Sequence, residues 1–456
     1  MSSPAAQPAA KYEATAAAFV KEHRLPGAAV GIVHEAELAW AGGVGFADRA
    51  SKRPSDPRTL YRIASITKTV TATAVMQLRD SGKLALDDPA IDHLPELEAA
   101  KSPLGPIESL TIRRLLSHES GLQSEPPGTD WSAVVYEDDP ARTLARVAEI
   151  ETRVPVHTQW KYSNLAYQLL GEIVSRASGM PYSKYIRSKI LRPVGMTSTS
   201  LDPLSARLRA RCATGYEPRF LSDELDLAPH EASIFGAEGG LWSCVEDLGR
   251  WLSCQLSEDP KILSKETLDE MHKPRYLTDE EWTGAWCIGW YARRREDVIW
   301  VMHSGGHYGF ITAACFDPRE KVGAIALLNG IGDAPELAFQ LGTIARDAVR
   351  EAAPAIEVPK PLPKEWRPFV GLYTAPHFGT ILRVEWLDGK LTVLDPDFPD
   401  WKPTLAPTDE ADVFRIEPGV RESGELARFE RTKDGRVASL FLAVARLQRL
   451  EPVSAD

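Results

Sequence analysis

Cysteine is scarce in this chain and follows no pattern typical of a disulfide framework or a metal site. The five cysteines among 456 residues are Cys212, Cys244, Cys254, Cys287 and Cys315. Their number is odd and no pair has C-x-x-C spacing, which favours small buried thiols over disulfides. We therefore expect a protein of a reducing compartment.

Other absences narrow the class of protein further. No run of 18 apolar residues marks a membrane span, and the first residues lack the basic and then apolar pattern of a signal peptide. The net charge is −11 and no stripe of lysine and arginine is present, which disfavours a nucleic-acid partner. We expect a cytoplasmic protein that binds neither nucleic acids nor membranes, and the sequence does not indicate its oligomeric state.

Several catalytic and metal-binding motifs are also missing. The chain has no H-E-x-x-H motif, no Cys/His cluster and no G-x-S-x-G motif, so the α/β-hydrolase class is excluded. His303 and His307 are four residues apart, but the glycines between them disfavour the helix that a metal pair would need. We therefore expect no metal ion and no cofactor.

The composition is that of a globular protein with more than one domain. Apolar residues make up 43% and charged residues 26% of a chain that is too long for one compact core. The proline-rich stretch APAIEVPKPLPKEW predicts an inter-domain linker over residues 353–365. This places one domain at residues 1–352 and a second at residues 366–456.

Hydrophobic periodicity in the first domain predicts strands at both ends with helices between them. The expected helices cover residues 10–23, 67–83, 109–118, 164–179 and 335–353, and the expected strands cover residues 27–33, 37–45, 298–304, 310–317 and 322–330. This order predicts one antiparallel sheet assembled from distant segments, with helices packed on it.

The second domain has a different hydrophobic pattern from the first. Beyond residue 366 the sequence consists of short alternating runs, and Asp-Gly turns at residues 388–389 and 434–435 join two pairs of them. This pattern predicts a small antiparallel barrel or sandwich.

Ser65 is the only serine of the first domain that is followed three residues later by lysine. If Ser65 starts a helix, Lys68 lies one turn later on the same face, and its amine can reach the hydroxyl. The start of a helix favours a developing anion, and a buried lysine can act as a base. An ordinary helix cap with a solvated lysine is the alternative, and this pair alone does not exclude it.

Two further clusters carry polar groups suited to catalysis. Tyr162 and Asn164 flank Ser163 just before a predicted helix, although an asparagine cap with a packed tyrosine would look the same. Farther along, a strand that carries His303 runs into Ser304-Gly305-Gly306, where missing side chains let a ligand approach the backbone.

Together these clusters resemble the signature of the penicillin-recognising serine hydrolases, a group that spans class C β-lactamases, DD-peptidases, D-aminopeptidases and family VIII-like esterases. The signature S-x-x-K, Y-x-N and K/H-[ST]-G is present as Ser65-Ile66-Thr67-Lys68, Tyr162-Ser163-Asn164 and His303-Ser304-Gly305. Residues 115–122, 162–186 and 236–251 match as well, so the resemblance covers roughly residues 10–350. It implies an α/β (α+β) fold of the β-lactamase/transpeptidase type, an antiparallel sheet flanked by helices.

The resemblance also implies roles for individual residues. Ser65 would form an acyl-enzyme, while Lys68 and Tyr162 would share the proton transfers in a division that the resemblance leaves open. Asn164 would bind Lys68 and the substrate amide, and His303 would supply polarity or partial positive charge. The substrate would also lie against Ser304 and Gly305, and the backbone N–H groups of Ser65 and Gly306 would form the oxyanion hole.

One departure and several secondary residues follow from the same resemblance. Histidine replaces the lysine found at position 303 in many relatives, so substrates with a carboxylate are less firmly implied. Glu238 is a tentative cleft residue, and His118 is interpreted as a structural histidine at a helix end. Some relatives carry a lipocalin-like C-terminal barrel that can border the active site. Arg446 and Arg449 are then tentative contacts for a substrate carboxylate, and exposed arginines without a role are the alternative.

The leading hypothesis is a serine hydrolase that cleaves amide or ester bonds of a small-molecule or peptide substrate. D-Amino-acid peptides or amides are the first substrate class and small acyl esters are the second. An acyltransferase or peptide-cyclising penicillin-binding-type thioesterase is the main alternative, followed by a β-lactamase. A non-catalytic binding module ranks last, because no catalytic position of the signature is missing.

Overall fold

The computed structural model describes residues 3–130, 139–201, 203–218, 225–227, 236–257, 261–352, 361–375 and 379–450. The chain divides into two compact units, Met1–Ala353 and Pro354–Asp456. The linker expected over residues 353–365 lies mostly outside the described residues, so its conformation stays a prediction.

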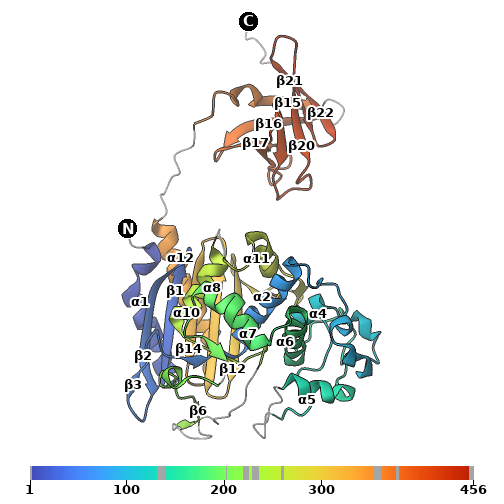
Figure 1. Ribbon diagram of the computed structural model, residues 1–456. Coiled ribbons are helices and arrows are strands. Elements are labelled where there is room, and N and C mark those ends of the chain that lie inside the picture. Colours follow the sequence, from blue (N-terminus) through green and yellow to red (C-terminus); the bar gives the residue numbers. More distant parts are fainter. Residues whose placement is uncertain are drawn as a thin grey trace. The chain divides into compact units, whose positions relative to one another are not determined.

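A nine-stranded antiparallel sheet forms the centre of the first unit, counted over its described residues (Figure 1). In spatial order its strands are β3 (Arg53–Pro54), β2 (Glu37–Asp48), β1 (Gly27–His34), β14 (Val322–Leu328), β13 (Phe310–Asp317), β12 (Val298–His307), β11 (Tyr291–Arg295), β10 (Gly284–Trp286) and β9 (Tyr276–Leu277). The first and last parts of the unit meet where Ala28 of β1 pairs with Leu328 of β14. The expectation of one sheet built from distant segments is confirmed.

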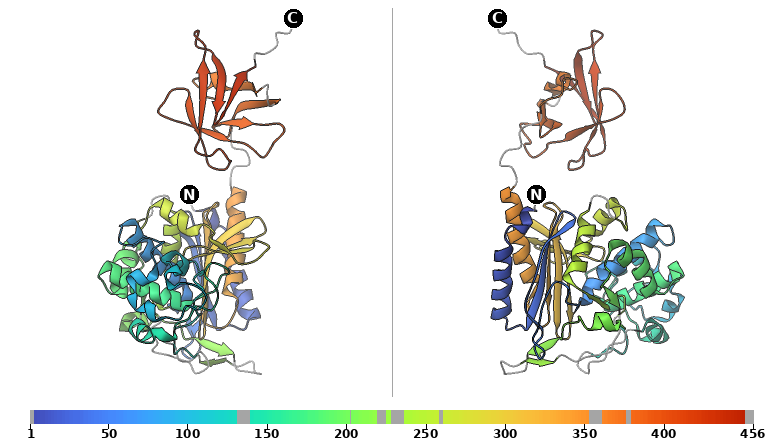
Figure 2. Two further views of the ribbon diagram at one scale, coloured as in Figure 1. Left: turned by 90° about the vertical axis from the view of Figure 1, so that its right-hand side faces the viewer. Right: turned by 60° about the vertical axis from the view of Figure 1, so that its left-hand side comes forward.

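Helices cover both faces of this sheet, as Figure 2 shows. Helices α1 (Ala9–Glu22) and α12 (Ala334–Ala352) pack together on one face, and α10 (Val245–Leu256) packs on the other. Strands β1, β13 and β14 are therefore buried on both sides, which explains why they read as nearly continuous apolar runs.

The remaining elements of the first unit are short apart from two long helices, α2 (Thr67–Asp80) and α6 (Asn164–Ser178). The others are β4 (Tyr61–Arg62), α3 (Ala90–His93), α4 (Ile112–Leu116), α5 (Pro140–Ala145), α7 (Tyr182–Ile186), α8 (Arg192–Val194), β5 (Ser200–Leu201), α9 (Ala206–Arg209), β6 (Tyr216–Pro218), β7 (Leu225–Leu227), β8 (Leu241–Ser243) and α11 (Lys265–His272). The helix expected over residues 109–118 is shorter than predicted. Thr111 caps α4, and His118 at its far end has a left-handed φ of +59°, which ends the helical path.

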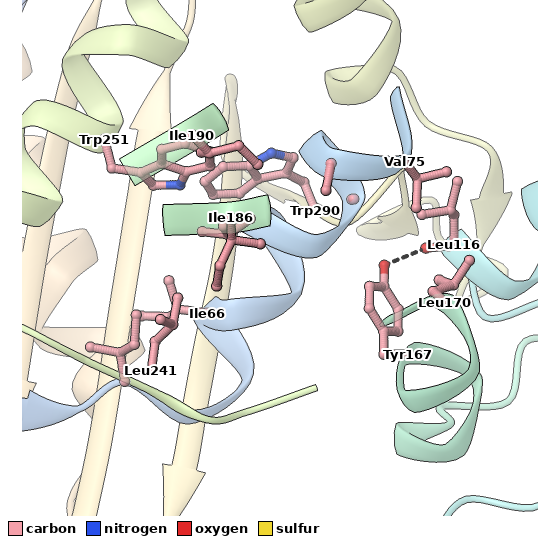
Figure 3. Packing of buried hydrophobic residues seen from close by; sticks show 14 of the residues in the cluster. Ile66, Val75, Leu116, Tyr167, Leu170, Ile186, Ile190, Leu241, Trp251 and Trp290 are labelled. Atoms are coloured by element: carbon pink, nitrogen blue, oxygen red, sulfur yellow. Dashed lines mark hydrogen bonds between the residues drawn. The ribbon is translucent and has the colours of Figure 1, made fainter. Parts of the chain in front are cut away.

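Helix α2 lies in the middle of the larger hydrophobic cluster and is buried along most of its length (Figure 3). Two of its buried threonines donate their hydroxyl protons to carbonyl groups one turn earlier in the chain. The hydroxyl of Thr69 donates to the Ile66 carbonyl at 2.8 Å, and that of Thr73 donates to the Thr69 carbonyl at 2.9 Å. Trp251 of α10 donates its indole N–H to Thr69 at 3.0 Å. A polar-looking helix can therefore occupy a core position.

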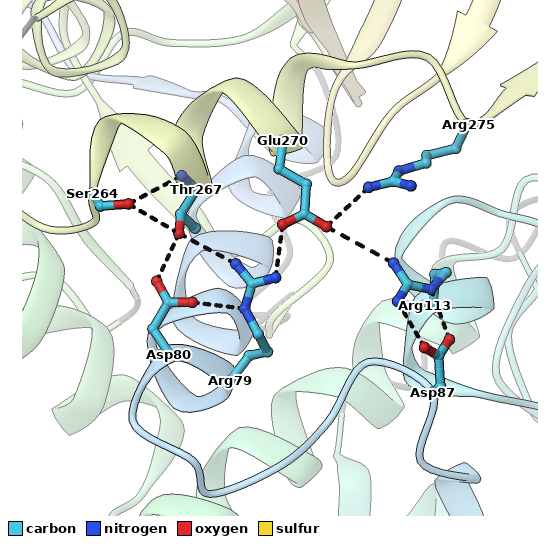
Figure 4. A network of polar contacts seen from close by, with 8 residues as sticks. All are labelled: Arg79, Asp80, Asp87, Arg113, Ser264, Thr267, Glu270 and Arg275. Carbon is cyan, nitrogen blue, oxygen red and sulfur yellow. Dashed lines mark hydrogen bonds and ion pairs between the residues drawn. The ribbon is translucent and has the colours of Figure 1, made fainter. Parts of the chain in front are cut away.

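An ion-pair network holds the C-terminal end of α2 (Figure 4). Glu270 of α11 accepts hydrogen bonds from Arg79 at 2.7 Å and from Arg275 at 2.9 Å, and Arg113 of α4 lies 3.9 Å from it. Burial raises the pKa of Glu270, but Arg79 and the other arginines outweigh that effect and hold the pKa below its usual value. The network ties α2 to its neighbours at the end far from Ser65.

The second unit is a closed antiparallel barrel whose strands follow one another in sequence order. They are β15 (Gly371–Ala375), β16 (Thr380–Leu387), β17 (Lys390–Leu394), β18 (Thr404–Pro407), β19 (Val413–Ile416), β20 (Leu426–Arg431), β21 (Val437–Leu442) and β22 (Ala445–Arg449). Apolar side chains such as Tyr373, Phe414 and Phe429 fill the interior. Of the two architectures predicted for this region, the barrel is confirmed.

No helix in the described part of the chain has both the length and the apolar character needed to cross a bilayer. The cytoplasmic location stays a prediction. All five cysteines are free thiols; Cys212 is partly exposed and the other four are buried.

The thiols should differ sharply in reactivity. Burial raises the pKa of Cys244 and Cys254 to about 11 and that of Cys287 and Cys315 to about 12, so these groups stay protonated. We expect Ellman's reagent at pH 8 to modify only Cys212 in the native protein and all five thiols after unfolding in guanidinium. Dithiothreitol should leave the melting temperature unchanged. Fewer than five reactive thiols in the unfolded, unreduced protein would reveal a disulfide and contradict this expectation.

Candidate active site

Ser65 lies in a tight turn between β4 and α2. The turn is a 3₁₀ segment, Ala64–Ile66, and α2 begins only at Thr67. Ser65 thus lies in the 3₁₀ turn just before the helix, and Lys68 still follows within one turn. Ala64 has a φ of +44°, a left-handed conformation that costs energy for a residue with a side chain. Such strain persists only where the surrounding packing maintains it. Here the left-handed conformation of Ala64 orients the following residue, Ser65, toward the cleft.

Strand β12 packs directly against this turn, and a glycine makes the contact possible. A Cβ atom on Gly305 would lie 2.1 Å from the carbonyl oxygen of Ile63. The hydroxyl of Thr312 donates to the same oxygen at 3.1 Å. Gly306 is different, because a Cβ there would meet only Ile311, at 3.5 Å. Gly305 therefore allows β12 to lie close to the turn before α2, whereas Gly306 leaves room for a ligand.

Lys68 is fully buried and has three hydrogen-bond partners. Its Nζ lies 3.1 Å from Ser65 Oγ and donates to Asn164 Oδ1 and to the Glu238 carbonyl oxygen, both at 2.7 Å. Two of these partners can only accept a hydrogen bond. A neutral amine could donate to both and keep its lone pair for the hydroxyl proton of Ser65. The arrangement suits a base that activates a serine.

Glu238 enters the site differently from the expectation of a side chain in the cleft. It contributes its backbone carbonyl to Lys68, and its side chain is buried. Glu238 is not among the described residues that line the cleft.

Tyr162 lies beside Lys68 because Ser163 caps α6. The centroid of the Tyr162 ring is 5.0 Å from Lys68 Nζ, within the range of a cation–π contact. The Ser163 hydroxyl accepts the N–H of Ala166 at 3.0 Å and donates to the Gln123 carbonyl at 2.7 Å. The cap is therefore Ser163 and not Asn164, which leaves Tyr162 and Asn164 on either side of it as active-site groups.

His118 contacts the segment Tyr162–Asn164 through a hydrogen bond and a ring contact. Its Nδ1 accepts the backbone N–H of Ser163 at 3.1 Å, and its ring lies 4.3 Å from that of Tyr162 and 4.5 Å from that of Trp286. Burial, with smaller effects of Lys68 and His303, lowers the pKa of His118 well below its usual value. The ring is therefore neutral and carries its proton on Nε2. The structural histidine lies at the active site, where it positions Tyr162.

His303 is also neutral. Burial and the nearby Lys68 lower the pKa of His303 to about 3. Its Nδ1–H donates to the Ser304 carbonyl at 2.6 Å. The side chain therefore supplies polarity rather than positive charge.

Glu125 belongs to this site although no sequence motif marks it. Asn164 Nδ2 donates to both carboxylate oxygens of Glu125, at 2.9 and 3.1 Å. This contact turns the amide so that Oδ1 faces Lys68, which agrees with the expected bond between Asn164 and Lys68. The other expected role of Asn164, a bond to the substrate amide, competes with Glu125 for the same N–H groups. Only tertiary structure brings Glu125 to this place.

A cleft of about 1010 Å³ opens at Ser65. Tyr162, His303, Ser304 and Gly306 line it together with Ser65, so groups from all three sequence clusters meet in one cavity. Within the described residues, no group of three or more His, Cys, Asp or Glu side chains is placed to hold a metal ion.

The two arginines of the last barrel strand already have partners within the second unit. Arg446 donates to Glu430 at 2.8 Å, and Arg449 donates to the Pro368 carbonyl and, at 2.8 Å, to the Val370 carbonyl. Their contact with a substrate carboxylate stays a prediction.

Comparison with known sequences agrees with this geometry. The family model for Beta-lactamase matches residues 12–347. The chain belongs to the β-lactamase family. Among curated proteins, Protein flp of Staphylococcus aureus (strain N315) is 28% identical over 320 residues, which is 68% of this chain and 61% of flp. The match thus spans about 61% of the length of this curated relative.

Comparison with solved structures shows that the fold is similar as well. The octameric penicillin-binding protein homologue from Pyrococcus abyssi has a TM-score of 0.65 and 25% identity, and the match covers 96% of this chain and 99% of that one. A class C β-lactamase from Rhodobacter sphaeroides (TM-score 0.61, 21% identity) matches over 75% of this chain and 99% of its own. A D-stereospecific amidohydrolase from Streptomyces sp. (TM-score 0.59, 23% identity) matches over 73% and 98%. The expected β-lactamase/transpeptidase-like fold is confirmed.

The role of Glu125 can be tested by an isosteric change. In Glu125→Gln an NH₂ group replaces one acceptor oxygen, so one of the two hydrogen bonds to Asn164 is lost and the amide is free to turn away from Lys68. We expect kcat for p-nitrophenyl acetate to fall about tenfold with little change in KM, since a charged hydrogen bond contributes about 1.5–3 kcal/mol. Glu13→Gln, a change on the exposed side of α1, is the control. Unchanged kcat in Glu125→Gln would show that Glu125 does not position Asn164.

The buried histidines predict a loss of stability in mild acid. Burial lowers the pKa values of four histidines, those of His272, His303 and His307 to about 3 and that of His118 well below its usual value. Below about pH 6.5 the unfolded chain binds protons that the folded protein excludes, so the free energy of unfolding falls as the pH falls from about 6.5 to about 3.

Each such histidine contributes at most about 1.4 kcal/mol per pH unit to this loss. Urea unfolding at pH 7.5, 6.5 and 5.5 measures it. His272→Gln should flatten the dependence, while His23→Gln, at an exposed position, should not. Equal stability at all three pH values would contradict the neutral, buried state of these side chains.

Proposed function

We propose that this protein is a serine hydrolase that forms an acyl-enzyme on Ser65 and cleaves amide or ester bonds. The observation that carries the proposal is the environment of Lys68. Its buried amine is 3.1 Å from Ser65 Oγ, and Asn164 and the Glu238 carbonyl hold its other two hydrogen bonds. Burying a lysine amine is costly unless its hydrogen bonds are made, and here one of the three joins it to the hydroxyl of Ser65.

In the proposed mechanism Ser65 Oγ attacks the carbonyl carbon of the substrate while its proton passes to Lys68 or Tyr162. The backbone N–H groups of Ser65 and Gly306 would stabilise the oxyanion of the tetrahedral intermediate. The same proton then goes to the leaving amine or alcohol as its bond to carbon breaks. Water attacks the acyl-enzyme by the reverse sequence, which releases the acid and restores the Ser65 hydroxyl.

We propose D-amino-acid peptides or amides as the first substrate class and small acyl esters as the second. The sequence signature is shared with D-aminopeptidases and esterases, and the likeness to a D-stereospecific amidohydrolase supports the first class. Transfer of the acyl group to an amine would use the same groups. A β-lactamase activity is less favoured, because the neutral His303 leaves the third motif without a cation.

Three variants test the division of labour. Ser65→Ala should abolish hydrolysis of p-nitrophenyl acetate, because it removes the nucleophile. Lys68→Ala and Tyr162→Phe should each lower kcat by about 10²-fold or more, since both take part in proton transfer. Ser81→Ala, which changes a serine at the other end of α2, is the matched control and should keep full activity.

A covalent probe gives an independent readout. A fluorophosphonate should add to the native protein and to Ser81→Ala but not to Ser65→Ala, as seen by intact-protein mass spectrometry. Wild-type turnover by Ser65→Ala, or an adduct on that variant, would place the nucleophile elsewhere.

A further inference from the structure

The active-site cleft continues past Ser65 along the C-terminal part of β12, where β12 is not paired with β11. Strand β11 pairs with β12 only from Val298 to Met302, which lies opposite Tyr291. The part of β12 that carries Ser304 and Gly306 extends beyond this pairing and lines the cleft. The cavity can therefore reach from Ser65, on the face of the sheet covered by α2, to the face covered by α12.

Three consecutive arginines of β11 line this cavity: Arg293, Arg294 and Arg295. Arg294 donates to the Glu281 carbonyl at 2.8 Å, and Arg295 pairs with Glu336 of α12 at 2.8 Å. Arg293 is exposed, and its side chain forms no ion pair or hydrogen bond with the described part of the chain. Its guanidinium is therefore available to a ligand.

No acidic side chain of the cleft forms an ion pair with Arg293 in the described part of the chain. Asp279 accepts the N–H of Thr283 at 2.7 Å, Asp333 accepts the N–H of Glu336 at 2.9 Å, and Glu336 pairs with Arg295. Arginine keeps its charge throughout the physiological pH range, and its planar fork matches a carboxylate. His303 is neutral, so Arg293 on the neighbouring strand β11 supplies the positive charge that His303 lacks.

We propose that Arg293 binds a carboxylate of the substrate, so that this site acts on short peptides or related amides with a free acidic end. The proposal rests on the proposed function for the reaction itself. Arg293 pairs with Trp300, three residues before His303. Trp300 and His303 are an odd number of residues apart, so Arg293 and His303 lie on opposite faces of the sheet, about 10 Å apart along the strands at roughly 3.3 Å per residue. A carboxylate bound by Arg293 therefore lies at least about three extended residues from the bond that Ser65 attacks.

Binding to the inactive Ser65→Ala chain tests this without turnover. Isothermal titration calorimetry should compare D-Ala-Gly-Gly-Gly with its C-terminal carboxamide. We expect the free acid to bind at least about tenfold more tightly, and the difference to shrink at high salt. Arg293→Gln in the same background should remove the difference, while Arg293→Lys should keep part of it. The matched control is Arg319→Gln, which removes one positive charge from an exposed position outside the cleft and should have no effect.

Equal affinity for acid and amide, binding of neither peptide, or an equal loss in Arg293→Gln and Arg319→Gln would each overturn the proposal. Hydrolysis of p-nitrophenyl acetate is measured separately with Ser65 present. Arg319→Gln should leave it unchanged, because Arg319 is exposed and lies outside the cleft. If the unaltered chain hydrolyses no ester or amide, the proposed function fails, while the peptide-binding result still decides the role of Arg293.

Discussion

A fully buried lysine is the constraint on which the rest of the active site depends. An ammonium group removed from water is costly unless each of its protons has an acceptor, and Lys68 finds its acceptors on three separate segments. These are the turn before α2, the first residue of α6 and the chain near Glu238. Satisfying Lys68 therefore fixes the relative positions of Ser65, the proposed nucleophile, and of the segment that carries Tyr162.

The second constraint is the contact between the nucleophile turn and the sheet. Gly305 lets β12 approach the Ile63 carbonyl, and the left-handed Ala64 then presents Ser65 toward the cleft. The strain at Ala64 is maintained by core packing around α2, which is buried on almost all sides. The catalytic geometry thus rests on the same hydrophobic cluster that holds the first unit together.

Charge is distributed unevenly around this centre. Next to the nucleophile, His118 and His303 are neutral, and the carboxylate of Glu125 acts through Asn164 on Lys68. Along the cleft the exposed guanidinium of Arg293 supplies positive charge on a different strand. In the proposed function, the neutral histidines lie next to the reacting atoms and the cation lies at a distance, so substrate preference could change without alteration of Ser65 and Lys68.

The sequence alone determined those features that depend on short-range spacing. A serine and a lysine within one helical turn, a tyrosine and an asparagine on either side of a capping serine, and alternating runs closed by Asp-Gly turns each have a local physical cause. Such patterns predicted the sheet and the barrel and marked Ser65, Lys68, Tyr162, Asn164 and His303 as candidates. The resemblance to the penicillin-recognising serine hydrolases then joined these residues into one group. Tertiary structure alone decided the partners of these groups. Glu125, the Glu238 carbonyl, the contact of Gly305 with Ile63 and the place of Arg293 in the cleft all join residues far apart in the chain. No local pattern encodes such contacts, because they arise only when the packing of the whole sheet and its helices brings distant segments together.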